Sequence, residues 1–258
     1  MRARFRFSKL GKIRFTSHRD VARLWERALR RAELPVALTE GFSPRPKVHF
    51  GLALSTGHES LGEYIDIDFR EPECDSLDLG ALPDLLTGLL PEGLTVQAVA
   101  PITTSETSLQ QAVTSCEWEI DALGLAAEVA PATIAALLAA PEIVVTRQRK
   151  GNDVTDDIRP YILQLAVIGP VPGVLSPEGT RVITPAGTRL FAELATQPRG
   201  LRSTELLAAI GPEVTEGRVR RTHQWITLDG ARHEPLPLPR GTARDGATWA
   251  APVEARAS

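Results

Sequence analysis

The order in which strand-like and helix-like apolar spacings follow one another restricts the folds open to this chain. Residues 2–7 alternate arginine with apolar residues, as a strand with one buried face does. Residues 17–34 then place apolar side chains every three or four positions, as an amphipathic helix does. Alternating segments at 47–54 and 63–69, a helix near 78–90 and a strand near 94–102 follow. Strand, helix, two strands, helix and strand is the ferredoxin-like βαββαβ order.

The second half of the chain repeats that order without repeating the sequence. Strands are expected at 113–121, 142–150, 158–168, 179–191 and 219–228, with helices at 131–140 and 203–210. Residues 103–111 are rich in Thr, Ser and Gln and indicate a linker. Residues from 229 onward are rich in Pro, Ala and Gly, a composition typical of disorder. We therefore predict an α+β protein with ferredoxin-like halves at 1–103 and 104–228 and a disordered tail at 229–258.

Charge is unevenly distributed along the 258 residues. The whole chain has a net charge of −3, yet residues 1–50 hold 13 Lys/Arg and four Asp/Glu. A basic segment on an acidic body favours a polyanion as partner. The chain has only four lysines, so arginine replaces lysine throughout, but this does not explain why the bases cluster.

The first helix carries most of this positive charge. Ser17 is the expected N-cap, and Asp20 three positions later completes a pair that resembles a capping box. Arginines fill the face that the apolar stripe leaves free, and Arg2, Arg4 and Arg6 form a cationic face on the first strand. Arginine side chains fit phosphate oxygens well. The residues expected to contact nucleic acid are Arg14, Arg19, Arg23, Arg27, Arg30, Arg31, Arg45 and Lys47. Ion pairs with carboxylates of the same chain, or an acidic partner protein, are the alternatives.

The loop "GFSPRPK" presents the last two of these cations. Gly41 permits a positive φ, and Pro44 and Pro46 keep the loop extended. A stiff loop loses little entropy on gripping an anion. A purely structural crossover explains the same residues equally well.

Catalytic and metal-binding patterns are weak in this chain. His18 and His49 are candidates for acid–base catalysis, and with Glu59 and Glu63 they would suit a metal, but neither spacing is diagnostic. Asp156, Asp157 and Arg159 indicate a turn whose charges satisfy one another. No Walker loop, GxGxxG, HExxH, GxSxG or CxxxCxxC motif occurs, so we expect no cofactor and no metal site. The two cysteines, Cys74 and Cys116, are expected to be free thiols.

No apolar run is long enough for a transmembrane helix, and residues 1–7 lack the apolar core of a signal peptide. These features favour a cytoplasmic protein without a membrane partner.

The stretch from Phe5 to Phe69 resembles the radical-SAM-linked protein family, a domain of unknown function that occurs alone or fused behind a B12-type radical SAM protein. The later pieces "DDIRPYI" and "VRRTHQW" resemble that family more weakly. The matching positions of the motif include Ser17, His18, Asp20, Gly41, Phe42, Pro44 and Pro46. Because this chain has no radical SAM domain, the resemblance implies a radical SAM protein acting in trans. A looser, fold-level likeness to repeat-RNA-processing endoribonucleases and pseudouridine synthases also exists.

Taken with the basic face, the resemblance predicts a non-catalytic accessory protein for RNA modification. It would bind structured RNA, such as tRNA or rRNA, for a separate radical SAM enzyme. The alternatives are a metal-independent endoribonuclease or RNA-modifying enzyme that uses His18 or His49, and a protein-interaction module that docks an acidic surface.

Overall fold

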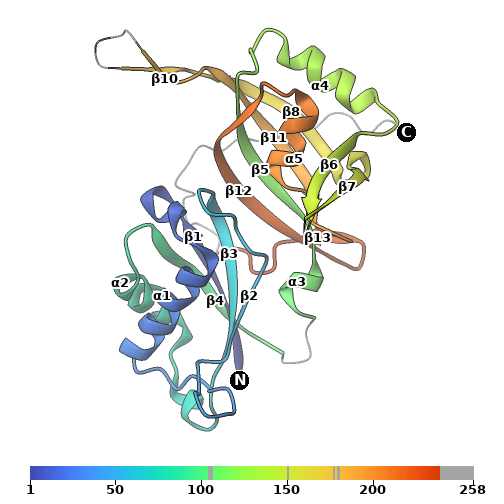
Figure 1. The fold of residues 1–258 in the computed structure, drawn as a ribbon. Coiled ribbons are helices and arrows are strands. Elements are labelled where there is room, and N and C mark those ends of the chain that lie inside the picture. Colours follow the sequence, from blue (N-terminus) through green and yellow to red (C-terminus); the bar gives the residue numbers. More distant parts are fainter. Residues whose placement is uncertain (104–106, 150, 177, 179–180, 239–258) are drawn as a thin grey trace.

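In the computed structural model, one mixed sheet runs through the whole molecule (Figure 1). The structure describes residues 1–103, 107–149, 151–176, 178 and 181–238. The main path of the sheet has the strand order β4-β1-β3-β12-β5-β11-β8, with β2 paired to β3 and β13 paired to β12. The fold is therefore of the mixed α/β kind, with a large sheet and few helices.

The first half builds four strands and two helices. β1 (Arg2–Lys9) is followed by the 3-10 helix η1 (Gly11–Phe15), α1 (His18–Arg31), β2 (Val48–Phe50) and β3 (Glu59–Asp68). The short 3-10 helices η2 (Glu73–Ser76) and η3 (Leu79–Ala81) lead into α2 (Leu82–Leu89) and β4 (Leu94–Ile102). β1 pairs antiparallel with both β3 and β4, and β2 pairs antiparallel with β3. The strands of this half therefore lie in the order β4-β1-β3-β2.

The second half shows the same relative order of its main strands. α3 (Leu109–Ala112) precedes β5 (Val113–Leu123), α4 (Ala130–Ala139), β8 (Ile162–Val171), β11 (Gly187–Ala195), α5 (Ser203–Ile210) and β12 (Thr215–Leu228). These strands lie in the order β12-β5-β11-β8, with antiparallel pairing throughout.

Two short hairpins interrupt the second half. The first joins β6 (Val144–Arg149) to β7 (Asn152–Asp157) and leads through η4 (Arg159–Tyr161) into β8. The second joins β9 (Val174–Leu175) to β10 (Val182–Thr184). Each hairpin is a separate two-stranded sheet outside the main path.

Two apolar cores hold the helices against the sheet. In the first half, Phe5 and Phe7 of β1 pack edge-on against Trp25 of α1, and all three side chains are buried. In the second half, Ile120 and Leu190 of the sheet pack with Leu206 of α5 in a separate cluster. Each half thus buries its own helices (Figure 1).

The two halves meet through β3 and β12. These strands pair in parallel over a short stretch, with Arg220 opposite Glu59 and Arg221 opposite Ser60. The sheet is consequently continuous from one half to the other.

The expected tail begins later than the composition indicates. Residues 231–233 form β13, which pairs with β12. Glu234 then forms an ion pair with Arg6 at 2.8 Å, which anchors this segment on the first half. The prediction of disorder from 229 is therefore wrong for 229–238, because backbone pairing and a buried ion pair offset the composition. The remainder of the expected tail, 239–258, lies outside the described residues.

Two short apolar segments of the first half form no strand. Residues 13–15 belong to η1. Residues 36–39 make only isolated bridges, from Val36 to Phe69 and from Leu38 to Pro46. A three- or four-residue apolar run carries too little periodicity to predict such conformations from the sequence.

Candidate nucleic-acid interface

Helix α1 is anchored by its cap and by its apolar stripe. The Ser17 hydroxyl accepts a hydrogen bond from the backbone N–H of Asp20 at 3.2 Å and donates to the Asp20 carboxylate at 2.7 Å. The hydrogen bond from Ser17 is the main reason why the pKa of Asp20 is lowered. Val21, Trp25 and Leu29 are buried against the sheet. The cap and the stripe therefore fix which face of α1 meets solvent, and both were predicted from the sequence.

The solvent face of α1 is a row of arginines. We call the exposed side chains of Arg19, Arg23, Arg27, Arg30 and Arg31 the α1 arginine row. The first four fall within about 80° of one another around the helix, because successive residues turn by about 100°. They extend along roughly 16 Å of the axis at 1.5 Å per residue.

These arginines are weakly engaged within the chain. Arg23 pairs with Asp20 at 3.0 Å, and both side chains are more than half exposed. Arg27 donates to the backbone oxygen of Arg23 at 3.3 Å. Within the part of the chain that the structure describes, Arg19, Arg30 and Arg31 have no carboxylate within ion-pair distance. The row thus presents positive charge to solvent.

Grooves flank the row on both sides. A groove of about 400 Å³ separates α1 from the proline loop and is lined by Arg19, Arg23, Arg30 and Arg45. A second, of about 780 Å³, separates α1 from η1 and is lined by Phe15, Arg23 and Arg27. The cations therefore line hollows in which a polyanion chain could lie.

Two phenylalanines of the first half are exposed, Phe15 at the second groove and Phe42 in the proline loop. Phe15 is 63% exposed and Phe42 is fully exposed. The Arg14 guanidinium lies 4.5 Å from the centre of the Phe15 ring. Exposed aromatic rings next to arginines are what single-stranded nucleic acids use as stacking platforms. Phe42 belongs to the motif of the family resemblance, whereas nothing in the sequence marked Phe15 as a candidate binding residue.

The proline loop has the conformation that its residues indicate. Gly41 has a φ of 121°, which favours glycine. Thr39 and Arg45 hydrogen-bond to each other through the backbone at 2.8 Å, and the Thr39 hydroxyl accepts a second bond from Arg45 N–H at 3.1 Å. Arg45 is exposed at the mouth of the first groove. The structure therefore brings Arg45 together with the α1 arginine row.

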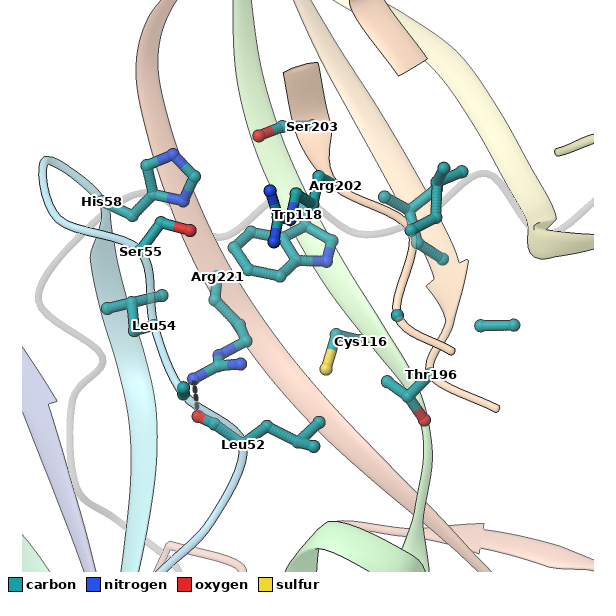
Figure 2. A pocket seen from close by; sticks show the side chains of 15 residues that line it. Leu52, Leu54, Ser55, His58, Cys116, Trp118, Thr196, Arg202, Ser203 and Arg221 are labelled. Carbon is teal, nitrogen blue, oxygen red and sulfur yellow. Dashed lines mark hydrogen bonds between the residues drawn. The ribbon is translucent and has the colours of Figure 1, made fainter. Parts of the chain in front are cut away.

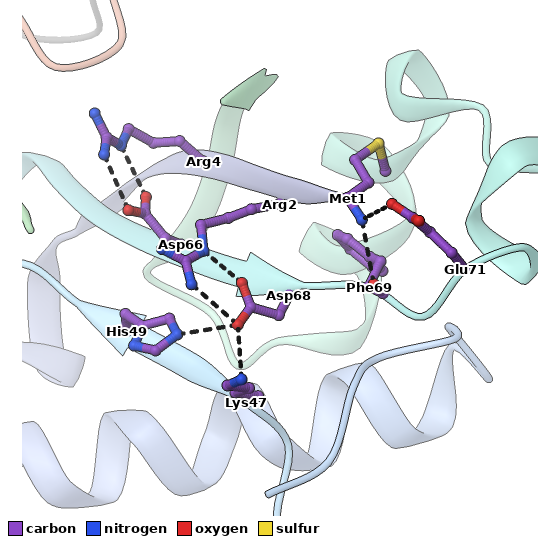
Figure 3. Close-up of polar contacts among 9 residues, drawn as sticks. All are labelled: Met1, Arg2, Arg4, Lys47, His49, Asp66, Asp68, Phe69 and Glu71. Carbon is purple, nitrogen blue, oxygen red and sulfur yellow. Dashed lines mark hydrogen bonds and ion pairs between the residues drawn. The ribbon is translucent and has the colours of Figure 1, made fainter. Parts of the chain in front are cut away.

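The arginines of β1 do not belong to this surface, which corrects the expected cationic strand face (Figure 3). Arg4 forms two hydrogen bonds with Asp66, at 2.8 and 2.9 Å, and is only 4% exposed. Arg2 pairs with Asp68, and Arg6 pairs with Glu234. The antiparallel register places Arg2 opposite Asp68 and Arg4 opposite Asp66. The alternative of intramolecular pairing therefore holds for this strand.

Arg14 and Lys47 are partly engaged. Arg14 lies 3.7 Å from Glu59, and Lys47 lies 3.8 Å from Asp68 while remaining half exposed. Asp68 also contacts His49 at 3.3 Å (Figure 3). These two cations are weaker phosphate ligands than the arginines of α1, because each already has a carboxylate nearby.

The candidate catalytic histidines have separate surroundings. His18 packs edge-on against Phe50 with ring centroids 5.2 Å apart, and burial is the main cause of its lowered pKa. His49 is bound to Asp68 on β2. The two histidines thus have different partners, and these contacts do not bring them together. In the described residues, no group of three or more His, Cys, Asp and Glu side chains is placed to hold a metal ion.

The structure reveals a buried ionic cluster that sequence reasoning missed. Arg221 of β12 is fully buried and donates to both oxygens of Glu63, at 2.6 and 2.7 Å, and to the Leu52 carbonyl at 2.9 Å. Lys9 is also buried and donates to the carbonyl of Thr16 at 2.8 Å. Burial is the main cause of the lowered pKa of Lys9, and the Glu63 charge partly opposes it. Lys9 and Glu63 line a small cavity together with His18.

A second carboxylate also joins the halves. Glu59 of β3 accepts from Arg218 at 2.8 Å and from Arg220 at 3.1 Å. Its other oxygen accepts the backbone N–H of Gly11 at 3.0 Å. Glu59 and Glu63 are therefore occupied by arginines of β12, which removes them from any metal site. Their spacing on β3 offered no sequence signal, because the partners lie about 160 residues away.

A cavity of about 330 Å³ lies where the two halves meet (Figure 2). The segment 52–55, the start of α5 and Trp118 of β5 line it. His58 and Arg221 complete the wall from the two sides. Cys116 also lines the cavity, and burial raises the pKa of its thiol to about 11. Both cysteines are free and buried, as expected.

The later motif "DDIRPYI" serves the fold of the second half. Asp157 accepts backbone N–H groups from Ile143 at 2.7 Å and from Arg159 at 2.9 Å. Asp156 pairs with Arg147 at 3.0 Å and with Arg199 at 3.3 Å. The expected turn with mutually satisfied charges is therefore wrong in part, because Asp156 pairs outside the turn and the Arg159 side chain donates to the carbonyls of Leu138 and Ile162.

Comparison with known proteins identifies the family. The model of a family described as an uncharacterized protein conserved in bacteria (DUF2344) matches residues 2–190. The chain belongs to this family. No curated protein matches the chain.

Among solved structures, the chain is similar to one from the "Crystal Structure of a Cbf5-Nop10-Gar1 Complex". The identity is 11% and the TM-score 0.44, with 86% of this chain and 48% of that chain covered. This chain thus spans about half the length of that one. At this TM-score the likeness carries no functional argument. In the described part of the chain, no helix is both long and apolar enough to cross a lipid bilayer.

Proposed function

We propose that this protein binds structured RNA through the α1 arginine row and Arg45, and that it is a non-catalytic accessory in RNA modification. The main support for this proposal is that the arginines of β1 and those of α1 have different surroundings. Those of β1 are paired with carboxylates, whereas those of α1 face solvent. Arginines serving only to balance the acidic body would be paired in the same way on both elements. The exposed arginines of α1 are therefore available for an external anion.

The aromatic side chains favour RNA over a purely acidic protein surface. Phe15 exposes a large apolar ring at the groove beside α1, and Phe42 exposes another in the proline loop. Arginines that contact phosphates and aromatic rings that stack on bases together match unpaired RNA segments. An acidic protein surface would need the charges but not the rings.

The fold supplies a rigid platform for this surface. We propose that residues 1–102 and 113–228 are two ferredoxin-like units, because each half orders its strands by the same rule and packs two helices with them. The β6–β7 and β9–β10 hairpins would then be insertions in the second unit.

The proposed partner enzyme follows from the sequence and not from the geometry of the site. A radical SAM protein acting in trans rests on the sequence resemblance, which is strong from Phe5 to Phe69 and weaker in the later pieces. The surroundings of His18 and His49 do not favour the alternative of an endoribonuclease, because each histidine has its own structural contacts.

Charge reversal tests the proposal with a matched control. Arg19→Glu with Arg30→Glu should weaken binding of a structured RNA, such as bulk tRNA, by roughly tenfold or more at moderate salt. Arg70→Glu with Arg181→Glu changes the net charge equally at exposed sites outside α1 and outside its two grooves, and should change the affinity by less than about threefold. Fluorescence anisotropy with labelled tRNA measures both. Equal loss in the two double variants would show a non-specific charge effect and contradict the proposal.

A further inference from the structure

The wall of the cavity between the halves contains a buried polar atom that lacks a hydrogen-bond partner among the described residues. His58 is 8% exposed, and its Nε2 lies 2.9 Å from Glu216. Its other ring nitrogen, Nδ1, is buried and has no hydrogen-bond partner among the described residues. In Figure 2 the ring lies at the edge of the cavity, with one nitrogen on the side of Ser55 and Trp118. A buried polar atom without a partner is costly unless a ligand or water meets it.

The hydrogen bonds around Glu216 determine which ring nitrogen of His58 is left for a ligand. Burial opposes ionisation of Glu216, but hydrogen bonds from His58 and Ser203 outweigh it and lower the pKa of the carboxyl. An ionised carboxylate only accepts hydrogen bonds, so Nε2 of His58 carries a hydrogen. Nδ1 then accepts a hydrogen bond in the neutral ring and donates one in the protonated ring. The cavity therefore suits a ligand whose edge carries both donors and acceptors.

Other parts of the wall suit a flat ring and an anion. Trp118 lines the cavity, with its ring centroid 6.1 Å from that of His58. Leu54 and Leu201 add apolar surface. Arg202 is exposed at the start of α5, and its side chain has no ion-pair partner in the part of the chain that the structure describes.

We propose that this cavity binds a single nucleotide. The base lies against Trp118 and hydrogen-bonds with Nδ1 of His58, while the phosphate contacts Arg202 at the start of α5. A volume of about 330 Å³ lies within the range of small-molecule sites. The inference deepens the proposed RNA binding, because an unpaired nucleotide of the bound RNA would supply this ligand. A free nucleotide has the same chemistry.

Binding of the four ribonucleoside 5′-monophosphates to the full chain, followed by NMR or calorimetry, tests the site. At least one should bind at millimolar concentration or below. Arg202→Ala should weaken that nucleotide about tenfold and leave the matching nucleoside unchanged, because only the phosphate is lost as a partner. Trp118→Leu should weaken both.

The control is Arg181→Ala, at an exposed site outside both α1 and the cavity, which should leave mononucleotide binding unchanged. His58→Phe keeps a ring but removes both ring nitrogens, and should weaken binding at least threefold if the variant remains folded by circular dichroism. Because Arg202 is exposed, its variant decides the test even if the His58 variant unfolds. Absence of binding by all four monophosphates, or unchanged binding in the Arg202 and Trp118 variants, would overturn the inference.

Competition separates the two sources of the nucleotide and the two proposals. An oligoribonucleotide that displaces the mononucleotide assigns the cavity to a nucleotide of the RNA chain, whereas simultaneous binding assigns it to a free nucleotide. If RNA binding depends on Arg19 and Arg30 but no mononucleotide binds, only this inference fails. If a mononucleotide binds but the α1 double variant retains full RNA affinity, only the proposed function fails.

Discussion

The surroundings of each arginine, rather than its residue type, decide whether it stabilises the fold or faces a partner. Arg221 is fully buried and closes on Glu63 and the Leu52 carbonyl, which links β12 to the first half. Arg30 has an exposed side chain at a groove. The buried Arg221 therefore holds β12 against the first half, whereas the exposed Arg30 can bind an external anion. Substitutions at these two kinds of site should therefore affect stability and binding separately.

Breaking the buried pair should destabilise the protein strongly. Glu63→Gln leaves the Arg221 charge buried without its carboxylate, which we expect to lower the free energy of unfolding by about 3 kcal/mol or more. Urea unfolding followed by circular dichroism measures the change. Lys47→Gln, which removes a half-exposed cation 3.8 Å from Asp68, should cost less than about 1 kcal/mol. Similar costs for the two variants would argue against the buried pair as a major link between the halves.

His18 should make stability depend on pH. Its pKa is lowered from the ordinary value of 6.5, chiefly by burial, so the unfolded chain binds the proton more readily than the folded one. The His18 contribution is then fully present above pH 6.5 and declines as the pH falls below that value. His18→Phe keeps a ring against Phe50 and should flatten this part of the stability profile. Urea midpoints of the wild type and the variant are compared at several pH values. If the midpoints of both proteins change equally with pH, His18 is not the group responsible.

At the scale of single elements, β1 and α1 show what local sequence can and cannot predict. The apolar spacing and the Ser17 cap correctly predicted α1 and its exposed arginine face, because helix periodicity and capping are local properties. Whether Arg2 and Arg4 are paired or exposed depends on β3. Its Asp66 and Asp68 are spaced at the same two-residue interval and lie opposite the two arginines. That matching interval was visible in "YIDIDF", but the register that joins it to β1 is a property of the folded sheet. The helical surface of the candidate site was thus predictable, and the neutralised strand was not.

The loop and 3-10 elements beside α1 should contribute to binding through their aromatic rings. Phe15→Ala and Phe42→Ala each remove an exposed ring, so folding should change little, whereas RNA affinity should fall by about 1–3 kcal/mol for each ring that stacks on a base. The salt dependence of binding should stay as in wild type, because no cation is lost. Anisotropy titrations at two salt concentrations measure both quantities. Unchanged affinity in both variants would remove base stacking from the proposed interface.

At the scale of the whole molecule, long-range contacts unite what the sequence presents as separate pieces. The order of the main strands and helices could be predicted from periodicity, whereas the short strands β7, β9 and β13 lie in segments where no strand was predicted. The pairing of β3 with β12 could not be predicted, because Glu59 and Arg220 are distant in sequence and meet only in the sheet. The segment 229–238 likewise has no apolar period, yet it pairs with β12 and with Arg6. The cavity between the halves follows from these contacts and therefore had no sequence signal.

The salt dependence of RNA binding tests the central claim, that the α1 arginine row contacts phosphates. If the row and Arg45 together neutralise about five phosphates, the slope of log affinity against log salt concentration should be roughly −3.5 to −4.5 in wild type. Arg19→Ala with Arg30→Ala should reduce its magnitude by about 1.5, because two contacts are lost. A slope near zero in wild type, or one that the double variant leaves unchanged, would contradict this role for the helix.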